Sequence, residues 1–180
     1  KHLLKLGCRS SDTAELHFEN CRVPDSHRVG EVDAGFIDTM KILDRGRISI
    51  AAMALGLGFG ALEMAVSYAK DRKQFGKPIA DFQAVQWMLA DCKTELDAAA
   101  LLTYRAAWLA DHGKPFSREA SMAKLYASEA ATRACNKSLQ IHGGYGYTRE
   151  FAVERHLRDA KICEIGEGTS EVQRMVIARH

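Results

Sequence analysis

Two short segments near the start of the chain have partly alternating apolar and polar side chains. Residues 2–8 and 14–22 are bounded by turn-forming residues, and Glu15-Leu16-His17-Phe18-Glu19 shows the alternation most clearly. A period of two is typical of a half-buried strand, so both segments are predicted to be β-strands. Two strands alone are only marginally stable in water, and no later segment matches them as a partner. We therefore expect them to be the end of a larger sheet.

From residue 33 onward the apolar positions recur at helical spacing. In residues 33–71 they follow alternating spacings of four and three, at Ile48, Ala52, Leu55, Phe59 and Leu62. Other faces of this segment are apolar too, which predicts one long, central and largely buried helix. The small residues Ala52, Gly56 and Gly60 leave a groove along it. Packing against a neighbouring helix explains this groove more simply than a ligand does.

Two further long helices are predicted. Residues 81–112 have one apolar stripe, made of Val85, Leu89, Cys92, Leu96, Ala99 and Ala106. Gly113 and the nearby Pro115 are a typical helix stop. A third helix starts near Ser117 as its N-cap and breaks at Gly143-Gly144. Its stripe of small residues favours close helix contacts and consists of Ala123, Ala127, Ala130 and Ala134.

Two shorter helices follow, at residues 149–159 and 170–179, and Ser170 with Gln173 has the spacing of a capping box. The pattern predicts a mainly α chain, with an antiparallel four-helix-type bundle at residues 31–180. Residues 1–30 are predicted to be the last strands of a β-domain. Because the chain begins with Lys1 rather than Met and its strands lack partners, we expect it to have been cut, processed or only partly supplied.

Charge and cysteine content narrow the class of function. The chain has 25 Lys and Arg against 23 Asp and Glu, for a net charge of +2, so neither nucleic acid nor an anionic membrane is a predicted partner. The five cysteines match neither a zinc site nor a disulfide framework, which favours a reducing compartment and predicts no metal. The longest uncharged run, residues 48–62, is shorter than the roughly 20 residues that span a bilayer.

Three stretches outside the apolar stripes suit chemistry. DRKQFGKP at residues 71–78 places cations beside an aromatic ring at a helix end, where they could cap the helix or bind a phosphate joined to a ring system. QIHGGYGY at residues 140–147 fits either a helix C-cap or the close approach of a phosphate or flat cofactor to the backbone. EIGEGTSEVQR at residues 164–174 sets Glu167 between two glycines, as either a mobile polar loop or a carboxylate placed for proton abstraction.

Together with KLGCRSSDTAELHFENCRVP at residues 5–24, these stretches closely resemble the acyl-CoA dehydrogenases, particularly the short-chain and short-branched-chain members. The resemblance covers all 180 residues. It implies that this chain is the C-terminal portion of such a protein, with FAD bound between a middle β-domain and the C-terminal bundle, across a subunit boundary. It further implies α,β-desaturation of an acyl-CoA thioester, electron transfer to an electron-transfer flavoprotein, and a homo-oligomer that is a tetramer. The location implied is the bacterial cytoplasm or the mitochondrial matrix.

By this resemblance Glu167 is the base that removes the α-proton, and its own backbone N–H helps to stabilise charge on the thioester oxygen. Gly166 and Gly168 make that approach sterically possible. Other relatives carry the base on the first long helix, at the position of Gly46, and glycine cannot abstract a proton. Glu167 therefore has no rival. Many relatives have tyrosine at the position of Gly166, which leaves the contour of the acyl pocket open.

The other site residues follow from the resemblance position by position. Arg72 and Gln83 match contacts to the FAD of the neighbouring subunit, with Phe75 nearby. The remaining FAD contacts are Gln140, Ile141, His142, Gly143, Gly144, Thr169, Ser170 and Glu171. The acyl-CoA contacts are Asp44, Arg45, Gly46, Arg47 and Gly168. Two other functions stay open: a non-catalytic assembly module, and a flavin oxidase or monooxygenase of the same fold.

Overall fold

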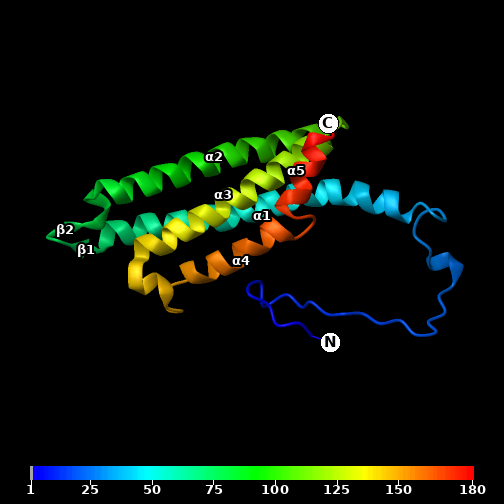
Figure 1. Ribbon diagram of the computed structural model, residues 1–180, viewed down its shortest axis with the longest axis horizontal. Helices are drawn as coiled ribbons and strands as arrows, with labels where there is room; N and C mark the ends of the chain where they lie inside the picture. Colours follow the sequence, from blue (N-terminus) through cyan, green and yellow to red (C-terminus); the bar gives the residue numbers. More distant parts are fainter. Residues whose placement is uncertain (1) are drawn as a thin grey trace.

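The computed structural model describes residues 2–180, which form a bundle of helices with an extended N-terminal segment (Figure 1). The helices are α1 (Gly35–Asp71), α2 (Gln83–Asp111), α3 (Ser117–His142), α4 (Val153–Ile165) and α5 (Ser170–Ala178). The connections contain η1 (Asp25–His27), η2 (Ile79–Asp81) and η3 (Gly143–Tyr147), and a hairpin of β1 (Lys73–Gln74) and β2 (Lys77–Pro78). The predicted mainly α bundle is confirmed, although α4 starts and ends later than expected.

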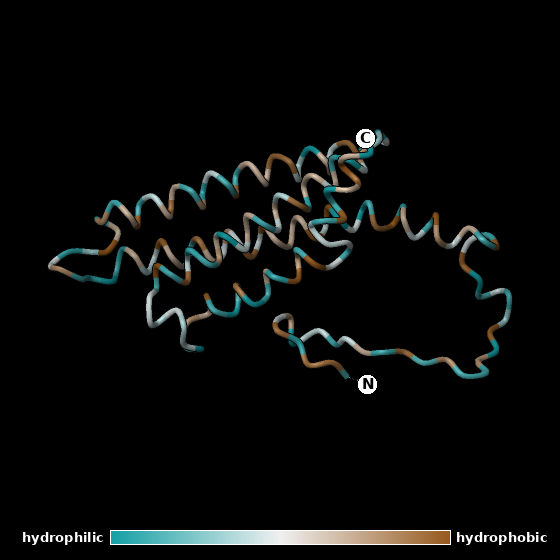
Figure 2. The backbone as a smooth tube through the Cα atoms, in the orientation of Figure 1, coloured by the Kyte–Doolittle hydropathy of each residue, from teal (hydrophilic) through white to brown (hydrophobic). Residues whose placement is uncertain are grey.

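Helix α3 lies at the centre of the bundle and contacts α1, α2, α4 and α5. Every alanine of its predicted stripe is buried, so the neighbouring helices approach its backbone closely. More than half of α3 is buried, against about a quarter of α1. The prediction that α1 is the central helix is therefore wrong. Its first turns project beyond the bundle, and apolar and polar residues alternate there without a covering helix (Figures 1 and 2).

The close contact between α1 and α3 is made at Gly58. A Cβ at Gly58 would lie 2.6 Å from Leu96 Cδ2 and 3.2 Å from Ala131 Cα, so a side chain there would require Leu96 to move and α3 to shift slightly. The predicted groove is wrong in two of its three positions, since Ala52 and Gly56 are exposed. Because α1 is apolar on several faces, its periodicity did not identify the packed face. By length and composition α1 could also cross a membrane, but here it packs along α3.

Residues 2–34 form no regular strand in the described part of the chain. A single antiparallel bridge joins His2 to Ala14, and the Leu3 N–H donates to Thr13 O at 3.1 Å. Within this chain the segments 2–8 and 14–22 form no ladder, because a ladder needs a continuous neighbour and the two segments meet only here. That they are the last strands of a larger sheet stays a prediction. The segment returns to α4, where the Cys8 N–H donates to Asp159 Oδ1 at 2.6 Å (Figure 1). The division at residue 30 stays a prediction.

Two helix starts differ from their predicted caps. The Ser117 hydroxyl donates to Asp44 Oδ1 at 2.9 Å instead of capping α3. In α5 the N-cap is Thr169, not Ser170, so the predicted capping box is wrong. Gln173, the other half of that box, reaches back into the turn before α5. Both Ser117 and Gln173 thus serve contacts between elements, which a local capping pattern cannot reveal.

Candidate active site

The turn between α4 and α5 carries Glu167 in a left-handed conformation. Its φ is 55°, and that of the following Gly168 is 96°. For a residue with a side chain this region costs about 1–2 kcal/mol, so contacts elsewhere must hold the turn in place. Helix α4 closes immediately before it, where the Gly166 N–H donates to Ile162 O at 2.7 Å. The turn therefore aims Glu167 in a direction that neither helix would give it.

The Glu167 carboxylate lies against Gly46 of α1. A Cβ on Gly46 would overlap Glu167 Oε2 and would lie 2.6 Å from Glu167 Cδ. The missing side chain at position 46 is what makes room for the carboxylate. The sequence related these two positions only as alternative places for a base, whereas the structure brings them into contact. Glu167 remains exposed to solvent within this chain.

A polar cluster beside Gly46 joins α1 to the start of α3. Arg47 is buried, and its Nη1 donates to Asp44 Oδ1 at 2.5 Å and to Ser121 Oγ at 3.3 Å. Arg47 Nε is buried without a hydrogen-bond partner among residues 2–180, which leaves a strong donor for an added acceptor. Of the predicted acyl-CoA contacts, Asp44, Gly46 and Arg47 thus cluster near Glu167, while Arg45 is exposed and outside the cluster.

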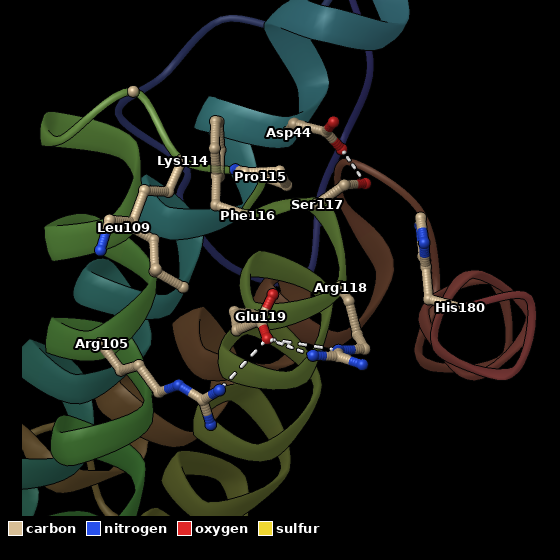
Figure 3. Close-up of a pocket in the computed structure, with 11 residues that line it drawn as sticks. Asp44, Arg105, Leu109, Lys114, Pro115, Phe116, Ser117, Arg118, Glu119 and His180 are labelled. Atoms are coloured by element: carbon tan, nitrogen blue, oxygen red, sulfur yellow. Dashed lines mark hydrogen bonds and ion pairs between the residues drawn. The ribbon is translucent and has the colours of Figure 1, made fainter.

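Asp44 also borders a pocket of about 620 Å³ between the end of α2 and the start of α3 (Figure 3). Glu119 stands between two guanidinium groups, with Arg118 Nη2 at 2.8 Å and Arg105 Nη2 at 3.3 Å from its Oε1. The hydrogen bond from Arg118 holds the pKa of Glu119 below its usual range. Positive charge still exceeds negative in the pocket, which suits phosphate groups. The remaining polar lining residues include Lys114 and His180.

A second group of predicted residues lies at the other end of α1. Arg72, the C-cap of α1, lines a cavity of about 590 Å³. Its Cζ is 5.4 Å from the centroid of the Tyr145 ring, and the His142 ring stacks on Tyr68 with centroids 4.3 Å apart. A cation, flat rings and exposed glycine backbone together fit a phosphate and a planar ring. The other predicted cofactor contacts in this cavity are Ile141, Gly143 and Gly144.

The remaining cofactor predictions lie outside that cavity. Phe75, at the hairpin tip, has a φ of 51° and is 92% exposed. Gln83 and Gln140 are exposed as well. Gly46 and Arg72 are 26 residues apart on one helix. At about 1.5 Å per residue this separates them by roughly 39 Å. The predicted residues therefore form two separate sites within one chain.

The family model "Acyl-CoA dehydrogenase, C-terminal domain" matches residues 33–180. This chain belongs to the acyl-CoA dehydrogenase family. It is 57% identical over 175 residues to "Probable acyl-CoA dehydrogenase YngJ" of Bacillus subtilis, a match that covers 97% of this chain and 46% of that protein. It is 52% identical to "Caffeyl-CoA reductase-Etf complex subunit CarC" of Acetobacterium woodii, over 97% of this chain and 46% of that one.

The solved structure of butyryl-CoA dehydrogenase from Megasphaera elsdenii has the same fold. It superposes with a TM-score of 0.98 at 47% identity and covers 99% of this chain and 47% of that chain. This chain thus spans less than half the length of the relatives named here.

The residues of this chain have contacts to offer that fit a flavin nucleotide at both candidate sites. Next to Glu167, the Ser170 hydroxyl is buried without a hydrogen-bond partner among the described residues, at the start of α5. The predicted contacts on either side of Ser170 have different surroundings. The Thr169 side chain caps α5, and the Glu171 side chain is exposed. At the other site the Arg72 cation and the backbone around Gly143 offer contacts to phosphate. No group of three or more His, Cys, Asp or Glu that could hold a metal occurs within residues 2–180.

Two residues that hold the Glu167 turn were missed in the sequence. Lys124 is completely buried and its Nζ donates to Gly168 O at 2.7 Å. Gln173 is also completely buried and donates to the same oxygen. The sequence did contain a signal that Lys124 is buried. Lys124 lies four residues after Ala120 and three before Ala127, on the buried stripe of α3. A lysine at such a position needs an internal partner.

Proposed function

We propose that this chain, together with the N-terminal half that its relatives carry, forms an FAD-dependent acyl-CoA dehydrogenase. Below, this complete protein is called the full-length protein. It forms a double bond between the α and β carbons of an acyl-CoA thioester. The observation that carries the proposal is the contact of the Glu167 carboxylate with Gly46, in a strained turn beside the Arg47 cluster. Similarity to butyryl-CoA dehydrogenase supports a short-chain acyl group.

Glu167 removes the α-proton as general base. The left-handed turn holds the Glu167 carboxylate over Gly46 of α1. In this proposal the substrate's α-carbon binds beside α1, within reach of that carboxylate. No hydrogen bond from the Glu167 N–H occurs among the described residues. This donor is therefore free for the thioester oxygen, where negative charge develops as the proton leaves. Arg47 Nε provides a further unpaired donor near Gly46.

Bound FAD supplies the acceptor for the hydride that leaves the β-carbon. With the α-proton on Glu167 and the hydride removed, the electron pair of the α C–H bond forms the double bond. The basic pocket around Arg105, Lys114 and Arg118 fits the phosphates of coenzyme A. Regeneration of oxidised cofactor then requires an electron acceptor. We propose an electron-transfer flavoprotein, supported by the relative whose name places it in an Etf complex.

The separation of the two sites supports an oligomer. Arg72 is roughly 39 Å from Gly46 along α1, by about 1.5 Å per residue, so its cavity is not next to the chain's own Glu167. We propose that the Arg72 cavity serves the FAD of a second copy in a homotetramer. Phe75, Gln83 and Gln140, which lie outside the cavity, are proposed as further contacts to that FAD. Bacterial relatives support a cytoplasmic location, with the mitochondrial matrix as the alternative. The balanced charge favours neither a nucleic-acid nor a membrane partner.

Arg72→Ala in the full-length protein is expected to weaken FAD binding about 10- to 100-fold, because a charge-assisted hydrogen bond contributes about 1.5–3 kcal/mol. Its cation–π contact with Tyr145 is partly exposed and contributes less to folding. FAD dissociation and the thermal midpoint of the apo-protein are measured together. Lys73→Ala, an exposed neighbouring cation, is the matched control and should change neither. A lower midpoint with unchanged FAD affinity would show that Arg72 is only structural.

The 180-residue chain alone is expected to be helical and oligomeric but to hold no FAD through gel filtration. The helices bury a core of their own, so the bundle is expected to fold. Glu167 and Phe75 are exposed in this chain, so each predicted flavin site is expected to need further residues from the N-terminal half. Circular dichroism, chromatography and flavin absorbance test this directly. A yellow, stable particle that dehydrogenates acyl-CoA would contradict it and would show that the missing half is dispensable.

A further inference from the structure

Lys124 is the only fully buried cation among residues 2–180, and its charge is directed at one backbone oxygen. Its Nζ donates to Gly168 O at 2.7 Å, and no other hydrogen-bond acceptor is present for it in the described chain. Burial lowers the pKa of Lys124 below its usual value, although the thiol of Cys163 and the carboxylates of Glu164 and Glu167 oppose this. An alanine at this position would continue the small stripe of α3 without the cost of a buried charge. Bundle packing therefore does not explain the lysine.

Gln173 of α5 reaches the same turn. Its Nε2 donates to Gly168 O at 2.9 Å and to Glu167 O at 3.3 Å. Gly168 O thus accepts from both Lys124 of α3 and Gln173 of α5. A Cβ at Gly168 would lie 2.8 Å from Gln173 Nε2, so this glycine lets the amide approach the backbone. Two buried donors from two helices hold the carbonyl groups of a turn whose φ angles are unfavourable.

We propose that Lys124 and Gln173 are positioning residues that lock the turn at Glu167 and Gly168 and so direct the Glu167 carboxylate to the substrate. This inference rests on the proposed role of Glu167 as base. Both residues donate to backbone carbonyl groups of the turn, Lys124 to Gly168 O and Gln173 to Gly168 O and Glu167 O, and not to the Glu167 carboxylate. With the carbonyls fixed, the Glu167 side chain stays over Gly46. When one anchor is lost, the turn relaxes toward commoner φ values and the carboxylate moves.

The test is Lys124→Met in the full-length protein, which keeps an unbranched apolar side chain as far as Cε and removes the Nζ donor. We expect kcat to fall about 10- to 100-fold, the scale of an error near 1 Å in a reacting group. KM, FAD content and thermal midpoint should stay close to those of the parent, because the buried cation is removed without stranding a hydrogen-bonded carboxylate and Gly168 O still accepts from Gln173. Lys124→Arg, which retains a donor at this position, should recover part of kcat.

Lys137→Met is the matched control, since Lys137 is on the same helix but pairs with Asp91 at the surface. It should leave kcat unchanged. A folded Lys124→Met variant with parental kcat would overturn the proposal, as would a loss of kcat that only follows loss of FAD. Should Lys124→Met fail to fold, Gln173→Leu decides, because it removes the other donor to Gly168 O. If Gln173→Leu loses kcat while FAD content and thermal midpoint are kept, the proposal is supported. If Gln173→Leu keeps the parental kcat, or also fails to fold, the proposal is overturned.

Glu167→Gln is measured in parallel, so that the two claims are separated. If Glu167→Gln keeps parental turnover, the proposed function itself fails. If Glu167→Gln loses turnover while Lys124→Met and Gln173→Leu keep it, only the positioning role fails.

Discussion

Glu167→Gln in the full-length protein is expected to lower turnover about 100- to 10,000-fold, the usual contribution of a general base. Glutamine has the size and shape of glutamate, so it can occupy the space over Gly46. It cannot accept the α-proton. FAD content and acyl-CoA affinity should therefore stay near the parental values while kcat falls. Steady-state kinetics with a series of acyl-CoA substrates, beside flavin absorbance, measures each quantity.

The control for this change is Glu129→Gln, the same substitution at a surface ion pair with Arg174. An exposed pair contributes little to stability, so this variant should match the parent in turnover. Turnover of Glu167→Gln within a few-fold of the parent would exclude Glu167 as the base. Loss of FAD in Glu167→Gln would instead indicate that the turn supports cofactor binding, and kcat would then be compared at saturating FAD.

Gly46→Ala is expected to lower kcat about 100-fold, through displacement of Glu167 rather than loss of its chemistry. The new Cβ would overlap the Glu167 carboxylate, which must move away from α1. Within a helix, alanine is more favourable than glycine by about 1 kcal/mol, so the variant need not be less stable. Activity and stability are thus expected to change independently. The measurements are kcat and thermal midpoint.

Gly56→Ala provides the matched control on the same helix. Position 56 is exposed, and a Cβ there meets nothing within 4 Å. Gly56→Ala should therefore raise the thermal midpoint slightly and leave kcat unchanged. If Gly46→Ala also leaves kcat unchanged, the Glu167 carboxylate is not held against position 46. The contact between Glu167 and Gly46 would then no longer support the proposed function.

The helices could be predicted because their signals are local. Stripes such as the alanines of α3, and stops such as Gly113, depend only on neighbouring residues in sequence. The strands at 2–8 and 14–22 could not be settled in this way, since a strand is defined by its partner. The centrality of α3 was missed for a similar reason. Burial depends on how helices are arranged, and α1 is apolar on several faces.

In the candidate site, too, the sequence predicted local features but not the contacts between elements. Resemblance selected Glu167, Gly46 and Arg72 from short motifs, but no motif states that Glu167 touches Gly46. That contact joins two helices and a strained turn, and depends on the backbone at both. Lys124 lies outside every quoted motif, and Gln173 lies in the last of them without a predicted role at the turn. Their roles follow only from burial and hydrogen bonds across elements, which is why Gln173 was first interpreted as a cap.

The most direct measurement is single-turnover reduction of the flavin by butyryl-CoA without oxygen, in the full-length protein and in Glu167→Gln. It isolates the chemical step from product release and from the electron acceptor. The parental protein should lose its oxidised-flavin absorption rapidly after mixing. Glu167→Gln should bind butyryl-CoA, shift the flavin bands and stay oxidised on the same timescale. Bleaching of Glu167→Gln at the parental rate would contradict the central claim that Glu167 removes the α-proton.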